Sequence, residues 1–372
     1  MNPQEQFCPN MSCPARGKTG EKNIVIHSQA PERYKCKECG KTFSAKVGTP
    51  FYRLHYTVDY VTCVITLIAY GCPVQAIVAA FQIDERTVME WQKRSGEHAQ
   101  QVHEHLVQHP RDLIHVQADE IRVKAQGAVL WLGMAIMVST RLWLGAVVSE
   151  SRDERLIREL VSLIRASALA RPLLICVDGL RSYVTVIQAI FRSPLPTRKK
   201  GRPRLISWPD IHIGRVIKHY QGRRVVDIVR KMAQGSEKAA KALLASSSGG
   251  TKLNTAYIER LNATFRSRLA CLVRRSRALL KNPDTLAPLV YLIGTVYNFC
   301  SEHQSLRLKL SVGSRGYRWV QRTPAMAAGI ADHCWSVKEL LLFRMPLPAW
   351  TPPIHRGRRS ALEKALIDRW CS

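Results

Sequence analysis

Three acidic residues are of a type, and occur in an order, that could bind divalent metal ions. Asp119 lies in a run typical of a strand, Asp178 ends the buried run PLLICVD, and Glu259 lies early in a helical run. Carboxylates that lie side by side are costly to keep ionised unless a cation compensates their charge. Their joint occurrence predicts a metal site, whereas alone Asp178 could be a turn residue and Glu259 a solvated helix position.

The helix that carries Glu259 also offers groups that could bind a phosphate. The segment NTAYIERLNATFRSRLACLVRR predicts one long helix that begins near Asn254 or Thr255. Asn262 and Arg266 follow Glu259 by three and seven residues, so the three side chains share one face. We expect Glu259 to bind metal, and the amide of Asn262 and the guanidinium of Arg266 to bind phosphate.

Neighbouring acids are alternatives to these metal ligands. Glu120 follows Asp119 directly, and successive residues of a strand point to opposite faces. Only one of Asp119 and Glu120 is therefore expected to reach a shared ion. Asp153, after the third strand-like run, is a further acid to weigh. The pattern of residues alone leaves the choice between Asp119 and Glu120 open.

Four of the eleven cysteines are spaced as ligands of one structural zinc ion. They form the pairs Cys8-x4-Cys13 and Cys36-x2-Cys39, and two such pairs on tight turns can close a tetrahedron of thiolates. NIVIH and ERYKC, between the pairs, predict short strands, which is typical of a zinc ribbon. Four buried cysteines without metal are the alternative, but so short a segment has little apolar core. The other cysteines show no pairing pattern and are typical of reduced thiols.

The residues after 108 predict the elements that position the acids. DLIHVQADEIRVK, AVLWLGMAIMVST and RLWLGAVVS are strand-like runs, and DERLIRELVSLIRAS is an amphipathic helix that precedes the run ending at Asp178. Three strands, a helix and a fourth strand are the order of an α/β, ribonuclease H-like fold with a mixed sheet, in which the first and fourth strands are neighbours. This order would bring Asp119 close to Asp178. DIHIGRVIKHY and RRVVDIVRKM predict added strands.

Residues 55–108 predict a helix-turn-helix domain. Apolar residues follow helical spacing over residues 57–70 and again over 73–81, and Asp84 is placed to cap a third helix. The basic residues that face outward on this third helix, and that could contact DNA, are Arg86, Lys93 and Arg94. The alternative is an ordinary three-helix unit with a solvated charged face.

The charge of the chain points to nucleic acid as its partner. Lys and Arg number 56 against 28 Asp and Glu, which gives a formal net charge of +28. Such a field concentrates polyanions, and its spread along the whole chain disfavours a single membrane-binding helix. The stretch TRKKGRPRL resembles an AT-hook, and the alternative is a solvated basic loop. Its residues that could enter a narrow A·T minor groove are Arg198, Lys199, Lys200, Arg202 and Arg204.

The sequence also predicts where the protein resides. The first residues show no basic segment followed by an apolar one, so we expect no signal peptide and a cytoplasmic, nucleoid-associated protein. The uncharged stretch 61–82 is interrupted by Gly71-Cys72-Pro73, which predicts two helices and not a membrane span.

In these motifs the chain resembles the insertion sequence one group of bacterial DDE transposases. The matching motifs are the cysteine ribbon that runs into GTPFY, the DE at Asp119, the VDG at Asp178, N-T-x-Y-I-E-R-x-N at 254–262 and NFCSEHQSLR from Asn298. The resemblance covers nearly the whole chain, and the I-E-R-x-N helix is its most specific part. Members of the group often split the DNA-binding and catalytic halves between two reading frames, whereas here both lie on one chain.

The resemblance implies a transposase that binds double-stranded DNA at element ends and target as a homo-oligomer. It implies two Mg²⁺ or Mn²⁺ ions on Asp119, Asp178 and Glu259, which selects Asp119 over Glu120. We therefore expect Glu120→Gln to leave cleavage largely intact. No Gly-x4-Gly-Lys-Ser/Thr loop occurs, so no nucleotide hydrolysis is expected. The predicted organisation is a zinc ribbon at 1–54, a helix-turn-helix domain at 55–108, a ribonuclease H-like catalytic domain at 109–310, and a C-terminal appendage and basic tail at 311–372.

Two other functions remain open on the sequence. The first is a non-catalytic DNA-binding regulator, such as a domesticated transposase, although loss of function would have no reason to spare three acids in order. The second is a ribonuclease H-like nuclease that cuts DNA without joining strands. Nothing in the sequence separates this nuclease from a transposase.

Overall fold

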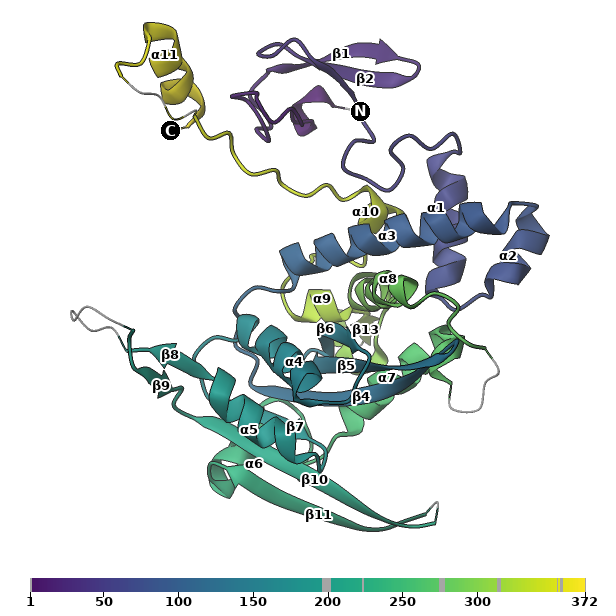
Figure 1. The fold of residues 1–372 in the computed structure, drawn as a ribbon, viewed down its shortest axis with the longest axis vertical. Coiled ribbons are helices and arrows are strands. Elements are labelled where there is room, and N and C mark those ends of the chain that lie inside the picture. Colours follow the sequence, from purple (N-terminus) through teal and green to yellow (C-terminus); the bar gives the residue numbers. More distant parts are fainter. Residues whose placement is uncertain are drawn as a thin grey trace. The chain divides into compact units, whose positions relative to one another are not determined.

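The computed structural model describes residues 2–195, 202–222, 224–273, 278–312, 316–352, 354 and 357–371. The chain is a mixed α/β protein whose residues form two compact units (Figure 1). The terminal unit comprises Met1–Val61 and Leu342–Ser372, and the central unit comprises Thr62–Leu341. This division differs from the four predicted ranges. The predicted helix-turn-helix range is divided near its start, and the end of the chain joins the same unit as its beginning.

A three-stranded antiparallel sheet in the order β1-β2-β3 forms the terminal unit. The elements are the 3-10 helix η1 (Pro3–Glu5) and the strands β1 (Ile24–Gln29), β2 (Glu32–Cys36) and β3 (Thr42–Ser44). The strands predicted from NIVIH and ERYKC are thus confirmed. Tyr34 and Phe43, opposite each other on β2 and β3, contribute the aromatic part of a small buried cluster.

The last residues of the chain form a helix within the range predicted as an appendage and basic tail. Helix α11 (Ala361–Trp370) begins with a capping box, in which the Ser360 hydroxyl accepts a bond from the Glu363 N–H and the Glu363 carboxylate accepts one from the Ser360 N–H. Trp370 is only 3% exposed and packs in the same cluster as Cys8. The capping box defines the start of α11, and burial of the Trp370 indole holds α11 within the terminal unit.

The central unit contains a six-stranded mixed sheet in the order β11-β10-β7-β4-β5-β6. Its first elements along the chain are β4 (His115–Ala125), β5 (Ala128–Met137), β6 (Leu142–Ser149), helix α4 (Glu154–Ala166) and β7 (Leu173–Val177). Strands β4, β5 and β6 are antiparallel, and β7 pairs in parallel with β4, with Val116 opposite Ile175. The predicted order of elements is confirmed, and the first and fourth strands are neighbours as expected.

The two runs predicted as added strands extend this sheet beyond β7. Strand β10 (Ile211–Gln221) pairs in parallel with β7, and β11 (Arg224–Gln234) pairs antiparallel with β10 as the edge strand. Before them, β8 (Arg192–Pro194) and β9 (Leu205–Ser207) form a separate hairpin. Leu205, predicted to be part of an irregular basic stretch, therefore begins a strand.

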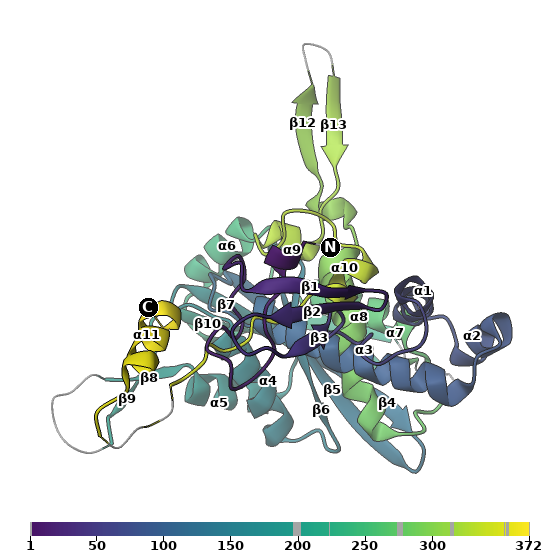
Figure 2. The ribbon, with the colours of Figure 1, turned by 90° about the horizontal axis from the view of Figure 1, so that it is seen from above.

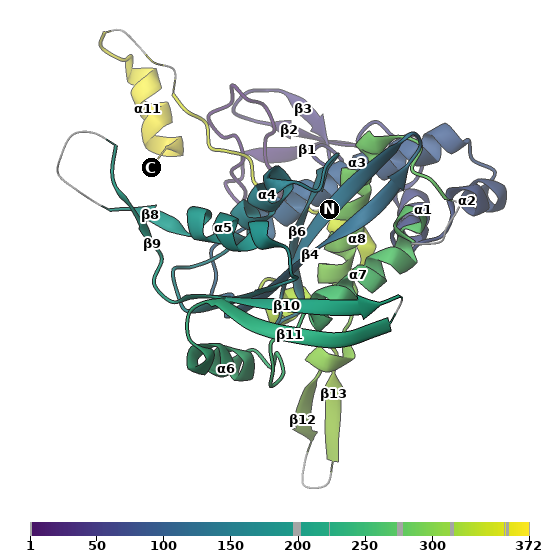
Figure 3. The same cartoon turned by 60° about the horizontal axis from the view of Figure 1, so that its bottom comes forward.

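Helices cover both faces of the sheet, and alternate residues of a strand serve the two faces. On β4, Val116 and Ala118 pack with α4 and α5 (Arg181–Ile190), whereas Ile121 and Val123 pack with residues of α7 (Ala256–Arg268) and α8 (Leu286–Cys300). On β7, Leu174 and Cys176 pack against α6 (Glu237–Ser246), which lies on the side of the sheet opposite α5 (Figure 3). The side chains of Asp119 and Glu120 therefore leave β4 on opposite faces of the sheet.

Three helices occupy the predicted helix-turn-helix range. They are α1 (Val58–Ala69), α2 (Val74–Phe81) and α3 (Glu85–Leu106), and Asp84 caps α3 by accepting a hydrogen bond from the Arg86 N–H at 2.8 Å. The second half of α3 packs against α8, where the Thr295 hydroxyl donates to the Ala99 carbonyl at 3.2 Å. A β-carbon at Gly96 would overlap with Pro288 of α8, so glycine permits this close approach. Within the described ranges, no helix is both long and apolar enough to cross a membrane.

The remaining elements complete the central unit. Helix α7 (Ala256–Arg268) ends earlier than predicted, because Leu269 takes an extended backbone conformation and turns the chain so that Leu269 and Leu272 are buried in the core. The other elements are η2 (Ala270–Leu272), η3 (Pro283–Thr285), α8 (Leu286–Cys300), η4 (Gln304–Leu306), β12 (Leu308–Val312), β13 (Gly316–Val320), α9 (Pro324–Ala327) and α10 (Val337–Leu342).

Candidate functional site

A polar cleft of about 620 Å³ lies beside the end of β7 in the central unit. Strand β4, the segment after β7, strand β10 and helix α7 all contribute side chains to it. The fold thereby brings together every residue that was predicted for the catalytic site, and the neighbouring acid Glu120 lines the cleft as well. These lining residues are Asp119, Asp178, Glu259, Asn262, Arg266 and, in addition, Glu120.

Carboxylate oxygens of Asp119, Glu120 and Asp178 lie within 4.8 Å of one another, a group that could hold a metal ion. This corrects the expectation that Glu120 would be turned away. Adjacent side chains of β4 do start on opposite faces, but β7 ends at Val177, level with Ala118 in the register of the pair. Beyond that point β4 still pairs with β5 on one side but, among the described residues, has no partner strand on the β7 side, so both carboxylates reach this open edge.

Glu120 is held by two partners that no local pattern in the sequence predicts. The Arg152 guanidinium donates to Glu120 Oε2 at 2.8 and 3.0 Å and to Asp178 Oδ2 at 3.2 Å, so it bridges the two acids. The Tyr183 hydroxyl, fully buried on α5, donates to Glu120 Oε1. Asp153, weighed above as a ligand, instead caps α4 by accepting from the Leu156 N–H at 3.1 Å.

The group of Asp119, Glu120 and Asp178 carries more negative charge than Arg152 alone balances. Burial, followed by the negative charges of Glu120 and Asp178, raises the pKa of Asp119 to about 7. Burial also raises the pKa of Glu120, against the hydrogen bonds from Tyr183 and Arg152 that lower it. A divalent cation would relieve this cost, and a set of carboxylate oxygens is the donor set of hard cations.

Asp178 divides its oxygens between two roles. Its Oδ1 accepts a hydrogen bond from the Leu180 N–H at 2.9 Å, which is the turn role considered as the alternative. Its Oδ2 faces Arg152 at 3.2 Å and belongs to the acidic group. The turn therefore orients the carboxylate without using up the oxygen that faces the cleft.

Glu259 lines the same cleft but makes different contacts. Its Oε1 accepts hydrogen bonds from Lys218 Nζ and from Thr255 Oγ1, both at 2.5 Å. Glu259 lies in the first turn of α7, and its side chain is 45% exposed. Binding of a metal through Oε1 would require this oxygen to exchange Lys218, on β10, for the ion.

Asn262 and Arg266 follow Glu259 along the face of α7 that borders the cleft. Asn262 is 1% exposed, and its Nδ2 donates to Asp119 Oδ2 at 2.7 Å. Its Oδ1 is buried and, within the described part of the chain, has no hydrogen-bond partner. A buried acceptor left in this way is a natural position for an ion or a water molecule. The amide, predicted to bind phosphate, is thus placed to orient Asp119.

Gln117 fixes the position of α7 relative to β4. The cap residue Thr255 makes no side-chain capping bond, and Gln117 Oε1 instead accepts from the Tyr257 and Ile258 N–H groups at 2.9 and 3.1 Å. Gln117 Nε2 donates to the Asn254 carbonyl at 2.8 Å. A buried side chain two residues before Asp119 therefore caps the helix that carries Glu259. This role of Gln117 is not predictable from the sequence, because a strand glutamine carries no signal of its distant partner.

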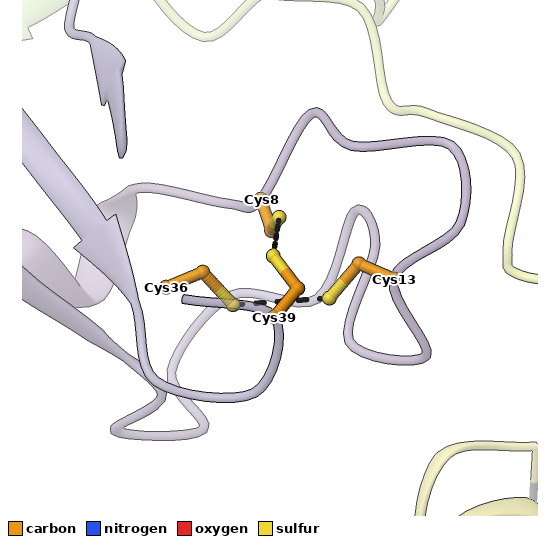
Figure 4. Close-up of side chains that lie close together, drawn as sticks. All are labelled: Cys8, Cys13, Cys36 and Cys39. Atoms are coloured by element: carbon orange, nitrogen blue, oxygen red, sulfur yellow. Dashed lines mark hydrogen bonds between the residues drawn. The ribbon is translucent and has the colours of Figure 1, made fainter. Parts of the chain in front are cut away.

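The four predicted cysteine ligands come together in the terminal unit (Figure 4). The Sγ atoms of Cys8 and Cys39 are 3.6 Å apart, those of Cys13 and Cys36 are 3.8 Å apart, and all four lie within 4.8 Å of one another. Burial raises the pKa of Cys8 to about 12, and hydrogen bonds outweigh burial to lower that of Cys39 to about 7. The four sulfurs could hold a metal ion.

Most of the predicted DNA-binding residues that the structure describes are exposed. Arg86 and Lys93 are exposed on α3, whereas Arg94 is half-buried. Of the AT-hook-like stretch, Arg202 and Arg204 are exposed. The others, Arg198, Lys199 and Lys200, lie outside the described residues. Contact of any of these residues with DNA stays a prediction.

No protein-family model matches the sequence, and a search of curated proteins finds no match either. Function must therefore be inferred from the cysteine group and from the acidic cleft.

Glu120→Gln is expected to weaken binding of a divalent cation by roughly tenfold or more. The change removes one negative charge from the acidic group and weakens the acceptor that holds Arg152 and Tyr183. The measurement is the Mg²⁺ concentration needed to raise the melting temperature of the full chain. Glu159→Gln, a surface change on α4 where Glu159 pairs with Arg155, is the control. If the Mg²⁺ concentration needed to raise the melting temperature is unchanged, Glu120 does not take part in the metal site.

Proposed function

We propose that this chain is a DNA transposase of the DDE kind, which binds the ends of an insertion sequence and cuts and joins DNA with two divalent metal ions. The observation that carries the proposal is the meeting of Asp119, Asp178 and Glu259 at one cleft, although they come from distant parts of the sequence. Asn262 and Arg266 line the same cleft. Mg²⁺, or Mn²⁺, fits a site whose donors are all oxygen atoms.

The topology supports assignment of the central unit to the ribonuclease H-like fold. Three antiparallel strands are followed by a helix and by a strand that pairs in parallel with the first. One acid lies on the first strand, one follows the fourth, and one lies in a later helix. This arrangement uses the sheet edge to assemble a site from segments that are far apart along the chain.

The sulfur group supports assignment of residues 1–54 to a zinc ribbon. In a tetrahedral Zn²⁺ site with Zn–S bonds of about 2.3 Å, the sulfurs are roughly 3.8 Å apart. The separations of 3.6 and 3.8 Å found here fit that geometry. Four thiolates leave no open position, so the ion would be structural and would stabilise a unit with a small apolar core.

The chemistry follows from the residues around the cleft. Divalent cations, when bound, activate the attacking oxygen and stabilise the leaving oxygen of an in-line displacement at phosphorus. Asp119 and Asp178 offer carboxylate oxygens to the cations, and Asn262 orients Asp119 through its hydrogen bond of 2.7 Å. Arg266 and Lys218 border the same space and are suited to bind phosphate oxygens. No covalent intermediate with the protein is needed.

Double-stranded DNA is the partner that the charge of the chain favours. A formal net charge of +28 supports strong binding of a polyanion that weakens steeply with salt. The exposed basic residues of α3 are the leading candidates for contacts with element ends. Joining two ends to one target favours action as a homo-oligomer, which is part of the proposal.

Incubation of the full chain with DNA that carries the element ends is expected to give Mg²⁺-dependent nicks and joined products. The ends to be tested are any inverted repeats found in the DNA on either side of the gene, and the same DNA with shuffled ends is the control. A chelator should abolish both products. Cleavage without joined products would favour a nuclease, and binding without cleavage in any divalent ion would favour a DNA-binding regulator. Sequencing of the products maps the cut.

A further inference from the structure

Strands β12 and β13 form a hairpin that stands apart from the main sheet. They make a two-stranded sheet of their own, and the hairpin projects away from the helices of the central unit (Figure 2). Its base is fixed: the His303 N–H donates to the Arg322 carbonyl at 3.0 Å, and Arg322 Nε donates to the Leu306 carbonyl at 2.8 Å. Leu306 is 5% exposed. The projection is therefore anchored in the core at its root.

The pairing register gives the hairpin two unlike faces. Residues directly opposite each other share a face, and successive residues alternate between faces. Lys309 is opposite Trp319, and Ser311 is opposite Tyr317, so these four residues lie on one face. We call it the aromatic face. The other face carries the pairs Leu308 with Val320 and Leu310 with Arg318.

The aromatic face combines exposed rings with positive charge. Tyr317 is 58% exposed and Trp319 is 40% exposed, and their rings are edge-to-face at 5.8 Å. The Arg307 guanidinium lies 4.0 Å from the centre of the Trp319 ring, and Lys309 Nζ lies 3.9 Å from the centre of the Tyr317 ring. Such cation–π contacts hold both the rings and the charges in place.

No acidic residue balances this charge locally. The sequence from Arg307 to Arg322 contains no Asp or Glu. Among the described residues, no carboxylate forms an ion pair with Arg307, Lys309 or Arg318. A polyanion would complement this surface. A second copy of the chain, itself at +28, would bring further positive charge to it.

We propose that the aromatic face of the β12–β13 hairpin binds an unpaired strand of DNA. Aromatic rings bind bases by stacking, and bases are available for stacking only where they are not paired within a duplex. Arg307 and Lys309, which lie against the two rings, are placed to meet the phosphates of the same strand. The proposal rests on the proposed function for the source of that strand, which is the single strand exposed where an element end is opened and cut.

The test replaces the two rings while keeping every charge. Tyr317→Thr with Trp319→Thr, in the full chain, is expected to lower affinity for a labelled oligo(dT) by about tenfold or more, because stacking on each ring is lost. Affinity for a duplex of the same length should change less than threefold. Threonine keeps the preference for a strand, so the hairpin should persist. Fluorescence anisotropy at one fixed salt concentration gives both affinities.

The matched control changes the opposite face of the same hairpin. Leu308→Thr with Leu310→Thr should leave binding of oligo(dT) close to wild type. If both double variants lose affinity equally, or if neither does, the proposal is overturned. A second variant, Arg307→Gln with Lys309→Gln, keeps the rings and should flatten the salt dependence of oligo(dT) binding. If the ring variant fails to fold, an unchanged salt slope in this charge variant overturns the proposal.

The outcome is separable from that of the proposed function. Binding of oligo(dT) needs neither divalent metal nor cleavage, so it can be measured in the presence of a chelator. Ring-dependent binding by a chain that never cuts DNA would retain this inference and reject the transposase. DNA cleavage by a chain whose oligo(dT) affinity does not depend on the two rings would retain the transposase and reject this inference.

Discussion

Glu259→Gln is expected to reduce metal-dependent DNA cleavage by roughly 10³-fold or more while DNA binding stays near wild type. The substitution keeps the size of the side chain and its position in the first turn of α7, but it removes one negative charge from the cleft. Loss of a charge that helps to hold the cations costs several kcal/mol of transition-state stabilisation, which sets the expected factor. Single-turnover cleavage and equilibrium binding on the same DNA separate chemistry from affinity.

Glu154→Gln is the matched control for this variant. Glu154 also lies in the first turn of a helix and has a basic partner, Arg158, at 2.5 Å, but it does not line the cleft. Cleavage by Glu154→Gln should remain within about twofold of wild type. Full cleavage by Glu259→Gln would remove Glu259 from the catalytic group and leave its contact with Lys218 as a structural ion pair.

Lys218 distinguishes a catalytic role of Glu259 from a purely structural one. If the ion pair only stabilised the fold, removing either partner would lower the melting temperature to a similar extent and affect cleavage alike. If Glu259 binds a cation, Lys218→Met should lower the Mg²⁺ concentration that gives half-maximal cleavage, because the competing ammonium is gone. The contact of 2.5 Å between Lys218 Nζ and Glu259 Oε1 is the basis of this distinction.

The neighbourhood of Asp119 and Asp178 could be predicted because it follows from topology. Strand-like and helical runs are visible in the sequence, and the rule that a helix connects parallel neighbours places the first strand beside the fourth. The spacing of the cysteines likewise carries its own geometry, and their sulfurs do come together. The prediction for the cysteines rests on their local spacing, and the prediction for Asp119 and Asp178 rests on the order of elements along the chain.

The position of Glu120 could not be predicted, because it depends on where the neighbouring strand stops. Alternation along β4 is real, and it places Asp119 and Glu120 on different faces. Strand β7 has only five residues, however, and its end leaves the edge open to both carboxylates. The length of a buried strand is poorly marked in a sequence, since its last residues look like those of any apolar segment.

Long-range partners were also missed. Gln117 caps α7 across 140 residues of sequence, and Arg152 bridges two acids from a loop. Such contacts are set by tertiary packing and leave no local pattern. Trp370, which packs beside the cysteines, is a further example, because nothing in the last residues indicates which unit they complete.

Cys36→Ser is expected to remove the metal from the terminal unit and to unfold that unit. The protein as purified should contain about one zinc ion per chain, and the variant close to none, because serine is a far poorer zinc ligand than a thiolate. The apolar cluster of this unit is small and includes Cys8, Cys13 and Cys36 themselves. Structural zinc contributes on the order of 10 kcal/mol to folding of such units, more than this cluster can replace. Elemental analysis and limited proteolysis of residues 1–61 give the two readouts.

Cys371→Ser is the control for Cys36→Ser, since Cys371 lies in the same unit but is exposed and outside the sulfur group. It should keep zinc and resist proteolysis like the wild type. Treatment of the wild type with a strong chelator should reproduce the effect of Cys36→Ser on residues 1–61, whereas the central unit should stay resistant. A folded, zinc-free wild-type protein would show that the four cysteines are packed thiols. In that case the distances of 3.6 and 3.8 Å between sulfurs would reflect packing alone.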